Sequence, residues 1–199
     1  MGSTMPGMSI RSVPVDRLHF TGDDEADRLL ASDPLALLIG FALDQQVTVQ
    51  KAFSGPLELR RRLRHLDPAR IAATDQAELE ELFRRRPALH RFPAAMARRV
   101  QALCAHVADR YGGDASRIWT DAADGRDLQK RLQALPSFGD MKVGSTLAIL
   151  RNRFGVALSG LDEVVPRHPT LGDVDSPEAL ERYQAAKRAH KAAIREAQG

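Results

Sequence analysis

The sequence is poor in cysteine, and it lacks both a long apolar run and any spacing typical of metal ligands. Its single cysteine, Cys104, excludes an internal disulfide and a cysteine-rich metal site. Cys104 lies in an apolar helical pattern, which favours a buried thiol. No segment is apolar enough to cross a membrane and no signal peptide is visible, so we expect a cytoplasmic protein. We expect no metal and no cofactor, because no His, Asp and Glu residues are grouped at ligand spacing.

The charge balance is mildly basic, and the apolar content is that of a folded domain. Lysine and arginine number 29 against 26 acidic residues, which gives a formal net charge of +3 and a sequence pI of about 9.3. This balance permits a nucleic-acid partner without demanding one. Apolar residues make up 43% of the 199 residues, enough to exclude a disordered chain and to bury a core.

Short helices without any alternating strand pattern are expected along the chain, and they predict an all-α fold. Asp33 and Pro34 are typical of a helix start, and the apolar pattern that follows predicts a central helix from Leu35 to about Ala52. A new helix is expected to begin at 54–56, where the sequence reads Ser-Gly-Pro. A last helix is expected to run from the Ser176 cap to Ala197.

The most informative segment is the turn 135–139, whose sequence is Leu-Pro-Ser-Phe-Gly. Helical patterns precede and follow it, so two helices are joined by a very short turn. Pro136 stops the first helix because it has no N–H to donate. Gly139 is expected to supply a backbone conformation that a side chain would resist, where the second helix starts. The segment therefore predicts a helical hairpin over 127–154.

The start of the second hairpin helix has the character of an anion site. First-turn N–H groups have no partner within a helix, and they lie at the positive end of its dipole. A phosphate is the usual ligand of such a site, and Lys142 would add a charge. An ordinary corner between two packed helices is the alternative interpretation.

The turn resembles the hairpin of the helix-hairpin-helix-GPD superfamily of base-excision-repair DNA glycosylases, which usually reads Leu-Pro-Gly-hydrophobic-Gly followed by a basic residue. Here Ser137 stands at the first glycine, and Asp140 stands where the basic residue is common. The resemblance covers about residues 33–162. It implies a two-lobed all-α fold that binds double-stranded DNA across a groove, through Pro136, Ser137, Phe138, Gly139 and Lys142. The single cysteine excludes the iron–sulfur cluster that some members hold.

A second segment, 43–48, reads Leu-Asp-Gln-Gln-Val-Thr and resembles the Leu-Ser-Gln-Gln-Thr segment of these glycosylases. The resemblance implies that Gln45 and Gln46 contact DNA, and that Gln46 fills the gap left by a flipped nucleotide. A side chain that wedges into this gap and bonds to the orphaned base lowers the cost of flipping. The alternative is a polar turn that faces water.

The resemblance also implies a catalytic aspartate beyond the second hairpin helix, where members of the superfamily carry Val-Asp-Thr-His followed by Arg. Asp162 with Arg167 matches part of this pattern, so Asp162 is the expected catalytic carboxylate. Its carboxylate would stabilise the positive charge that develops on the sugar. The alternative is an acid on a surface loop. Some members add a lysine near the hairpin, and Lys142 lies slightly out of register with it.

Arginine-rich stretches at 60–64 and 84–86, and a basic C-terminal helix, are either contacts to DNA phosphates or solvated faces. The expected organisation is a flexible segment 1–22, a helical domain 23–170 and a C-terminal helix within 171–199, in a monomeric protein. Three functions stay open: a monofunctional DNA glycosylase, a catalytically degraded protein that only binds damaged or distorted DNA, and a helical interaction protein without a nucleic-acid role.

Overall fold

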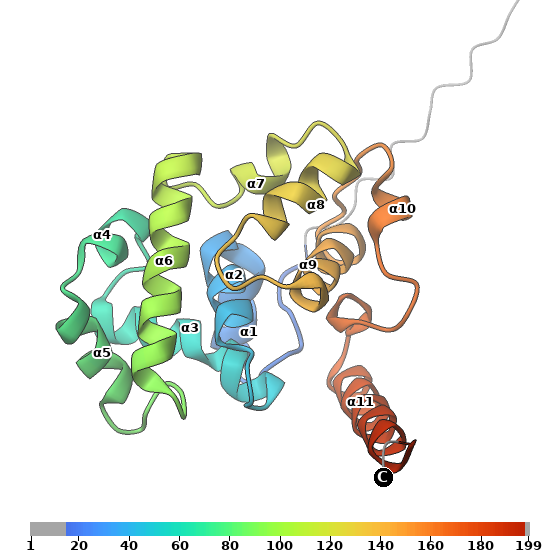
Figure 1. Cartoon of the computed structure of the whole chain (residues 1–199), viewed down its shortest axis with the longest axis horizontal. Helices are drawn as coiled ribbons and strands as arrows, with labels where there is room; N and C mark the ends of the chain where they lie inside the picture. The colour runs from blue at the N-terminus through green and yellow to red at the C-terminus, as the bar shows by residue number, and fades with distance from the viewer. Residues whose placement is uncertain (1–14, 198–199) are drawn as a thin grey trace, which may run out of the picture.

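A computed structural model describes residues 15–197, and helices are the only regular elements in that range (Figure 1). The all-α prediction is therefore confirmed. The first group of helices comprises α1 (Asp24–Ser32), α2 (Pro34–Leu43), α3 (Val49–Leu63), α4 (Pro68–Ala73), α5 (Gln76–Arg84) and α6 (Pro93–Tyr111). The second group comprises α7 (Arg117–Thr120), α8 (Gly125–Gln133), α9 (Asp140–Asn152), α10 (Leu161–Val164), the 3₁₀ turn η1 (Leu171–Asp173) and α11 (Pro177–Ala197).

The α2 helix is the centre of the first group. Asp33 caps it by accepting hydrogen bonds from the Leu35 and Ala36 amides, and Pro34 occupies the first turn, as the sequence predicted. Every residue from Leu35 to Leu43 is buried, because α1, α3 and α6 pack around the helix. An element that is apolar on all sides needs such a surrounding layer.

The predicted continuation of this helix to Ala52 is wrong. The α2 helix ends at Leu43, and Thr48 starts α3 by accepting a hydrogen bond from the Lys51 amide. The expected start at 54–56 is also wrong, because Pro56 lies inside α3. Gly55 is needed there for packing, since a Cβ would lie 2.4 Å from the Leu43 side chain. The helix therefore starts at the Thr48 cap and not at the Ser-Gly-Pro sequence. Residues 44–48 form the loop between α2 and α3.

The chain is already packed before α1. Leu18 and Phe20 are fully buried, and the Asp27 carboxylate accepts hydrogen bonds from the amides of Phe20 and Thr21. The packed part therefore begins ahead of residue 23, where the flexible segment 1–22 was expected to end. Residues 1–14 of that segment lie outside the described residues.

The second group is built on the hairpin of α8 and α9, and its core is continuous with that of the first group. Phe138, in the hairpin turn, is buried against Phe41 of α2, with ring centroids 6.2 Å apart. In Figure 1 the turn between α8 and α9 passes close to α2. Cys104 is buried in the same core, and burial raises the pKa of its thiol to about 12, so the thiol stays protonated.

The C-terminal helix is attached at its first half. Ala179 and Leu180 are buried, η1 packs on α9, and the side-chain amides of Gln184 and Gln50 hydrogen-bond to each other. This contact ties α11 to α3, which is distant in sequence. None of the helices among the described residues combines the length and apolarity that a bilayer crossing requires.

Candidate nucleic-acid interface

The hairpin turn presents free backbone amides to solvent. Gly139 and Asp140 are exposed at the start of α9, and the first amides bonded within the helix are those of Lys142 and Val143, both to the Gly139 carbonyl. Within the described residues, no hydrogen bond is made by the amides of Gly139, Asp140 and Met141. A helix start with open amides can bind a phosphate oxygen.

The conformational role expected of Gly139 belongs to Ser137 instead. Gly139 has an ordinary φ of −87°, whereas Ser137 has a φ of +66° in the left-handed region. A residue with a side chain adopts this left-handed conformation at a cost of roughly 1 kcal/mol. Nothing lies within 4 Å of a Cβ placed on Gly139, so neither its backbone nor its packing requires glycine. The absence of a side chain leaves room for close approach from outside.

The two glutamines of the 44–48 loop have different environments. Gln45 is half-buried, its carbonyl bonds to His90 at 3.0 Å, and its side-chain oxygen is buried with no hydrogen-bond partner among the described residues. Gln46 is exposed and has a left-handed φ of +55°. Strained backbone often marks functional positions. Gln46 is thus free to reach a ligand, while Gln45 and His90 anchor the loop.

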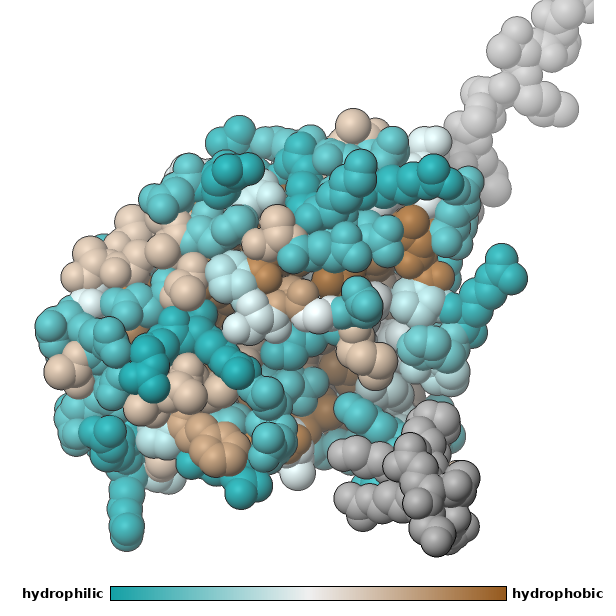
Figure 2. Space-filling view, viewed as in Figure 1, coloured by the Kyte–Doolittle hydropathy of each residue, from teal (hydrophilic) through white to brown (hydrophobic). Residues whose placement is uncertain are grey.

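The loop and the hairpin meet at a cavity of about 790 Å³, which we name the Asp44 cavity. The two segments are distant in sequence, and α11 closes a further side. Figure 2 shows apolar surface set back in a hollow between the two groups of helices, under a mainly hydrophilic exterior. Lining residues from the loop and its flanks are Phe41, Asp44, Gln46, Val47, Thr48, Val49 and Gln50. The others are Met141, Lys142, Ser145, Leu171, Tyr183, Gln184, Lys187 and Arg188.

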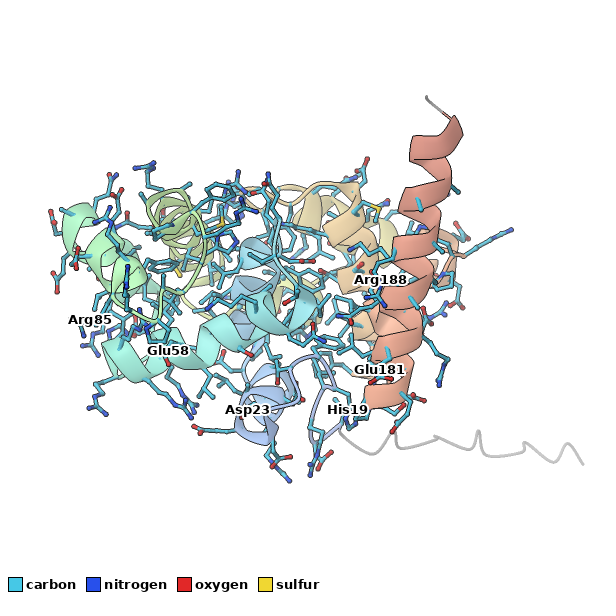
Figure 3. All side chains as sticks on the ribbon, turned by 90° about the horizontal axis from the view of Figure 1, so that it is seen from below. His19, Asp23, Glu58, Arg85, Glu181 and Arg188 are labelled. Atoms are coloured by element: carbon cyan, nitrogen blue, oxygen red, sulfur yellow. The ribbon has the colours of Figure 1, made fainter. Side chains whose placement is uncertain are left out.

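Cations surround one acid in this cavity. Burial raises the pKa of Asp44, and the positive charges of Lys187 and Lys142 oppose this shift. Burial lowers the pKa of Lys142, which Asp44 opposes. Figure 3 shows Arg188 on the side of α11 that faces the rest of the molecule. The surplus of positive charge suits a negatively charged ligand such as a nucleic-acid strand.

Asp162, the expected catalytic residue, lies elsewhere. It is on α10, its side chain is 86% exposed, and it pairs with Arg151 at 2.8 Å. It lines a separate cavity of about 440 Å³, which we name the Asp162 cavity, together with Asn152, Pro166 and His168. The structure thus brings together Gln46 and Lys142 at one cavity and places Asp162 at another.

The other predicted contact residues divide between surface and core. Pro136 is half-buried, Ser137 and Gly139 are exposed, and Phe138 is 7% exposed. Phe138 therefore supports the turn from inside, and contact with a strand is left to its neighbours.

Three features were not predicted from the sequence: the acid of the Asp44 cavity, the closure of that cavity by α11, and an exposed aromatic residue. Asp44 could have been noticed, because it replaces the serine of the Leu-Ser-Gln-Gln-Thr segment. Lys187 belongs to the basic C-terminal helix, for which contact with DNA phosphates was one of two expectations. Tyr183 carried no local signal, since a helix does not show which face will be covered. Phe92 is 39% exposed, contacts the His90 ring and lies under the Arg91 guanidinium. It is a surface aromatic residue beside the Gln45 anchor.

Most arginines of the stretches 60–64 and 84–86 form ion pairs or hydrogen bonds with other residues of the protein. Arg60 and Arg61 pair with Glu25, and Arg62 binds Glu58 and the carbonyls of Arg85 and Pro87. Arg85 lies at the opposite end of the molecule from Arg188 (Figure 3). The side chains of Lys191 and Arg195, in the basic C-terminal helix, lie outside the described residues. The basic side chains that line the Asp44 cavity are Lys142 of α9 and Lys187 and Arg188 of α11.

Comparison with protein families gives a match over residues 39–198 to the model described as HhH-GPD superfamily base excision DNA repair protein. The match spans most of the chain, including both motifs and α11. The chain belongs to the HhH-GPD superfamily. As a superfamily member, it is a DNA-binding protein of base excision repair. Searches of curated proteins and of solved structures returned no match.

Membership sets aside the interaction protein without a nucleic-acid role. A second segment of the chain is also similar in residue type to the superfamily's Val-Asp-Thr-His pattern. It reads Val174-Asp175-Ser176 and lies directly before α11. Val174 is buried, Ser176 caps the helix by accepting from the Ala179 amide, and Asp175 is exposed. Asp175 is not among the residues that line the Asp44 cavity.

Proposed function

We propose that the protein is a monofunctional DNA glycosylase, which flips a damaged base out of double-stranded DNA and hydrolyses its N-glycosidic bond. The observation that carries the proposal is the Asp44 cavity, where the exposed Gln46 and the hairpin's Lys142 converge. Its volume of about 790 Å³ is in the range of small-molecule sites, and it has room for a nucleobase with its sugar. Apolar and aromatic lining from Phe41 and Tyr183 suits a base face.

Each part has a task in this proposal. The open amides at Gly139 hold a phosphate of the strand, and Lys142 adds positive charge next to it. Gln46 occupies the space that the flipped nucleotide leaves in the duplex. A carboxylate then stabilises the positive charge on the sugar while the base departs, and water completes the hydrolysis.

Base release is the direct test. The full chain is incubated in excess with duplexes that carry one uracil, one alkylated purine, one oxidised guanine or one mismatch, and abasic sites are revealed by alkali. We expect release from at least one duplex. Release from none of them, by a protein that binds the same duplexes, would replace the proposal with the binding-only alternative.

One observation favours that alternative. The Asp162 carboxylate is exposed and paired with Arg151, an environment that does little to prepare an acid for catalysis. Both functions require DNA binding, so Lys142→Glu should weaken duplex binding and lower its salt dependence. Arg85→Glu, at the far end of the molecule, is the matched control and should leave both unchanged.

A further inference from the structure

The Asp44 cavity contains one carboxylate, that of Asp44, to which neither sequence motif gives a role. Asp44 follows the last residue of α2, and its amide bonds to the Phe41 carbonyl, which fixes the start of the loop. It is the one acidic side chain among the described residues that line the cavity. Its place is therefore set by a buried helix on one side and by the anchored Gln45 on the other.

The Asp44 carboxylate has no structural use within the described residues. Its oxygens make no hydrogen bond and no ion pair there, unlike those of Asp33, which cap α2. Asp44 is half-buried, and partial removal of a carboxylate from water without a partner costs stability. An acid that the fold holds in a cavity without such compensation is a candidate for a functional role.

The alternative acids lack this placement. Asp162 is 86% exposed, is paired with Arg151 and lines the other cavity. Asp175 is exposed and lies outside the Asp44 cavity. Among the acids of the described residues, Asp44 is the one that lines the same cavity as Gln46 and Lys142.

We propose that Asp44 is the catalytic carboxylate, and that it faces the anomeric carbon of the nucleotide held in the Asp44 cavity. This inference rests on the proposed glycosylase function. The bond between the anomeric carbon and the base nitrogen breaks, and its electron pair leaves with the base. Asp44 stabilises the positive charge left on the sugar. Water then adds to the anomeric carbon and loses a proton through Asp44 to solvent, while the base gains one from solvent. The products are a free base and an abasic site, with no change in oxidation state.

The charged neighbours favour the ionised form of Asp44 and so oppose the effect of burial. Lys142 faces it from α9, and Lys187 faces it from α11; both oppose the effect of burial on its pKa. Tyr183 and Arg188 line the same cavity from α11. Burial raises the pKa of the Tyr183 hydroxyl, and the negative charge of Asp44 raises it further. Arg99 of α6 acts on Lys142 and lowers its pKa. The α2 helix, which precedes Asp44, contains no acid or base.

The test compares Asp44→Asn with the matched variants Asp162→Asn and Asp175→Asn on the duplex that the wild type processes fastest. Under single-turnover conditions we expect Asp44→Asn to release base at least about 100-fold more slowly. Its duplex affinity should stay within about threefold of wild type, and both control variants should keep the wild-type rate within about threefold. A wild-type rate for Asp44→Asn, or a large loss confined to either control, overturns the assignment.

Two further measurements separate lost chemistry from lost folding. Because burial raises the pKa of Asp44 above its ordinary value, the folded state loses stability as the pH rises through the shifted pKa. Asp44→Asn should therefore melt above wild type at pH 7, with a smaller difference in acid. Asp44→Ser introduces the residue of the Leu-Ser-Gln-Gln-Thr segment and should be equally slow; a fast Asp44→Ser also overturns the assignment.

The outcomes distinguish this inference from the function on which it rests. Base release by the wild type together with an active Asp44→Asn rejects the role of Asp44 and leaves the glycosylase proposal standing. Absence of release by the wild type on every duplex rejects both.

Discussion

The Asp44 cavity and the Asp162 cavity each place an acid near basic side chains, yet the two acids have different surroundings. Asp44 is half-buried and has no hydrogen-bond or ion-pair partner among the described residues, whereas Asp162 is 86% exposed and bonded to Arg151. An exposed ion pair contributes little to stability and changes an acid's chemistry little, since water screens it. Burial alters both protonation and reactivity. The comparison teaches that the surroundings of an acid, more than its position in a motif, indicate whether it can act on a substrate.

The comparison also involves α11. This helix contributes side chains to the Asp44 cavity and none to the Asp162 cavity. The Asp44 cavity is therefore assembled from both groups of helices, while the Asp162 cavity is built within the second group alone. A site between two groups can bind a strand that crosses from one to the other.

The largest effect should come from removing the side chain that holds the hairpin at the Asp44 cavity. Phe138→Ala loses the contact with Phe41 and leaves a void, so we expect about 3 kcal/mol of destabilisation in urea unfolding. Met141→Ala is the control, because Met141 is 67% exposed in the same segment and should change stability by less than about 0.5 kcal/mol. Equal effects of the two would mean that the turn is not packed as described.

A smaller effect is expected from reversing the charges of α11. The double variant Lys187→Glu with Arg188→Glu should weaken duplex binding at least about tenfold at low salt, and it should reduce the slope of affinity against salt. Fluorescence anisotropy with a labelled duplex measures both quantities. Arg126→Glu with Arg151→Glu, on the side of the Asp162 cavity, should have a weaker effect. The reverse order would make that cavity the DNA-facing one.

The smallest effect concerns the two left-handed residues beside the Asp44 cavity. Ser137→Gly and Gln46→Gly should each raise the free energy of unfolding by roughly 0.5–1 kcal/mol, since glycine adopts a positive φ without a steric cost. Their functional effects should differ: Ser137→Gly keeps duplex binding and base release, whereas Gln46→Gly loses the wedge and slows release. If Gln46→Gly released base as fast as Ser137→Gly and the wild type, Gln46 would have no part in the proposed mechanism.

The sequence alone was sufficient for the helix starts at Asp33 and Ser176. Asp33 and Ser176 lie at the starts of their helices, as expected, because a side chain that bonds to nearby amides acts locally. The hairpin was predicted for the same reason, since Pro136 ends α8 without help from distant residues. The break at Asp44 was missed, because polar residues such as Asp44, Gln45 and Gln46 can also lie on the exposed face of a continuing helix, and the Thr48 cap that starts α3 was not recognised.

The residues themselves determined the all-α fold, the hairpin with its open amides, and the resemblance that the family match confirmed. These follow from interactions within a few residues, or from motifs read directly along the chain. Only the tertiary structure decided which side chains share a cavity, because Asp44, Lys142 and Lys187 come together through the packing of three separate helices. Burial, and with it the pKa of an acid, depends on that packing and on nothing that neighbouring residues in the chain reveal.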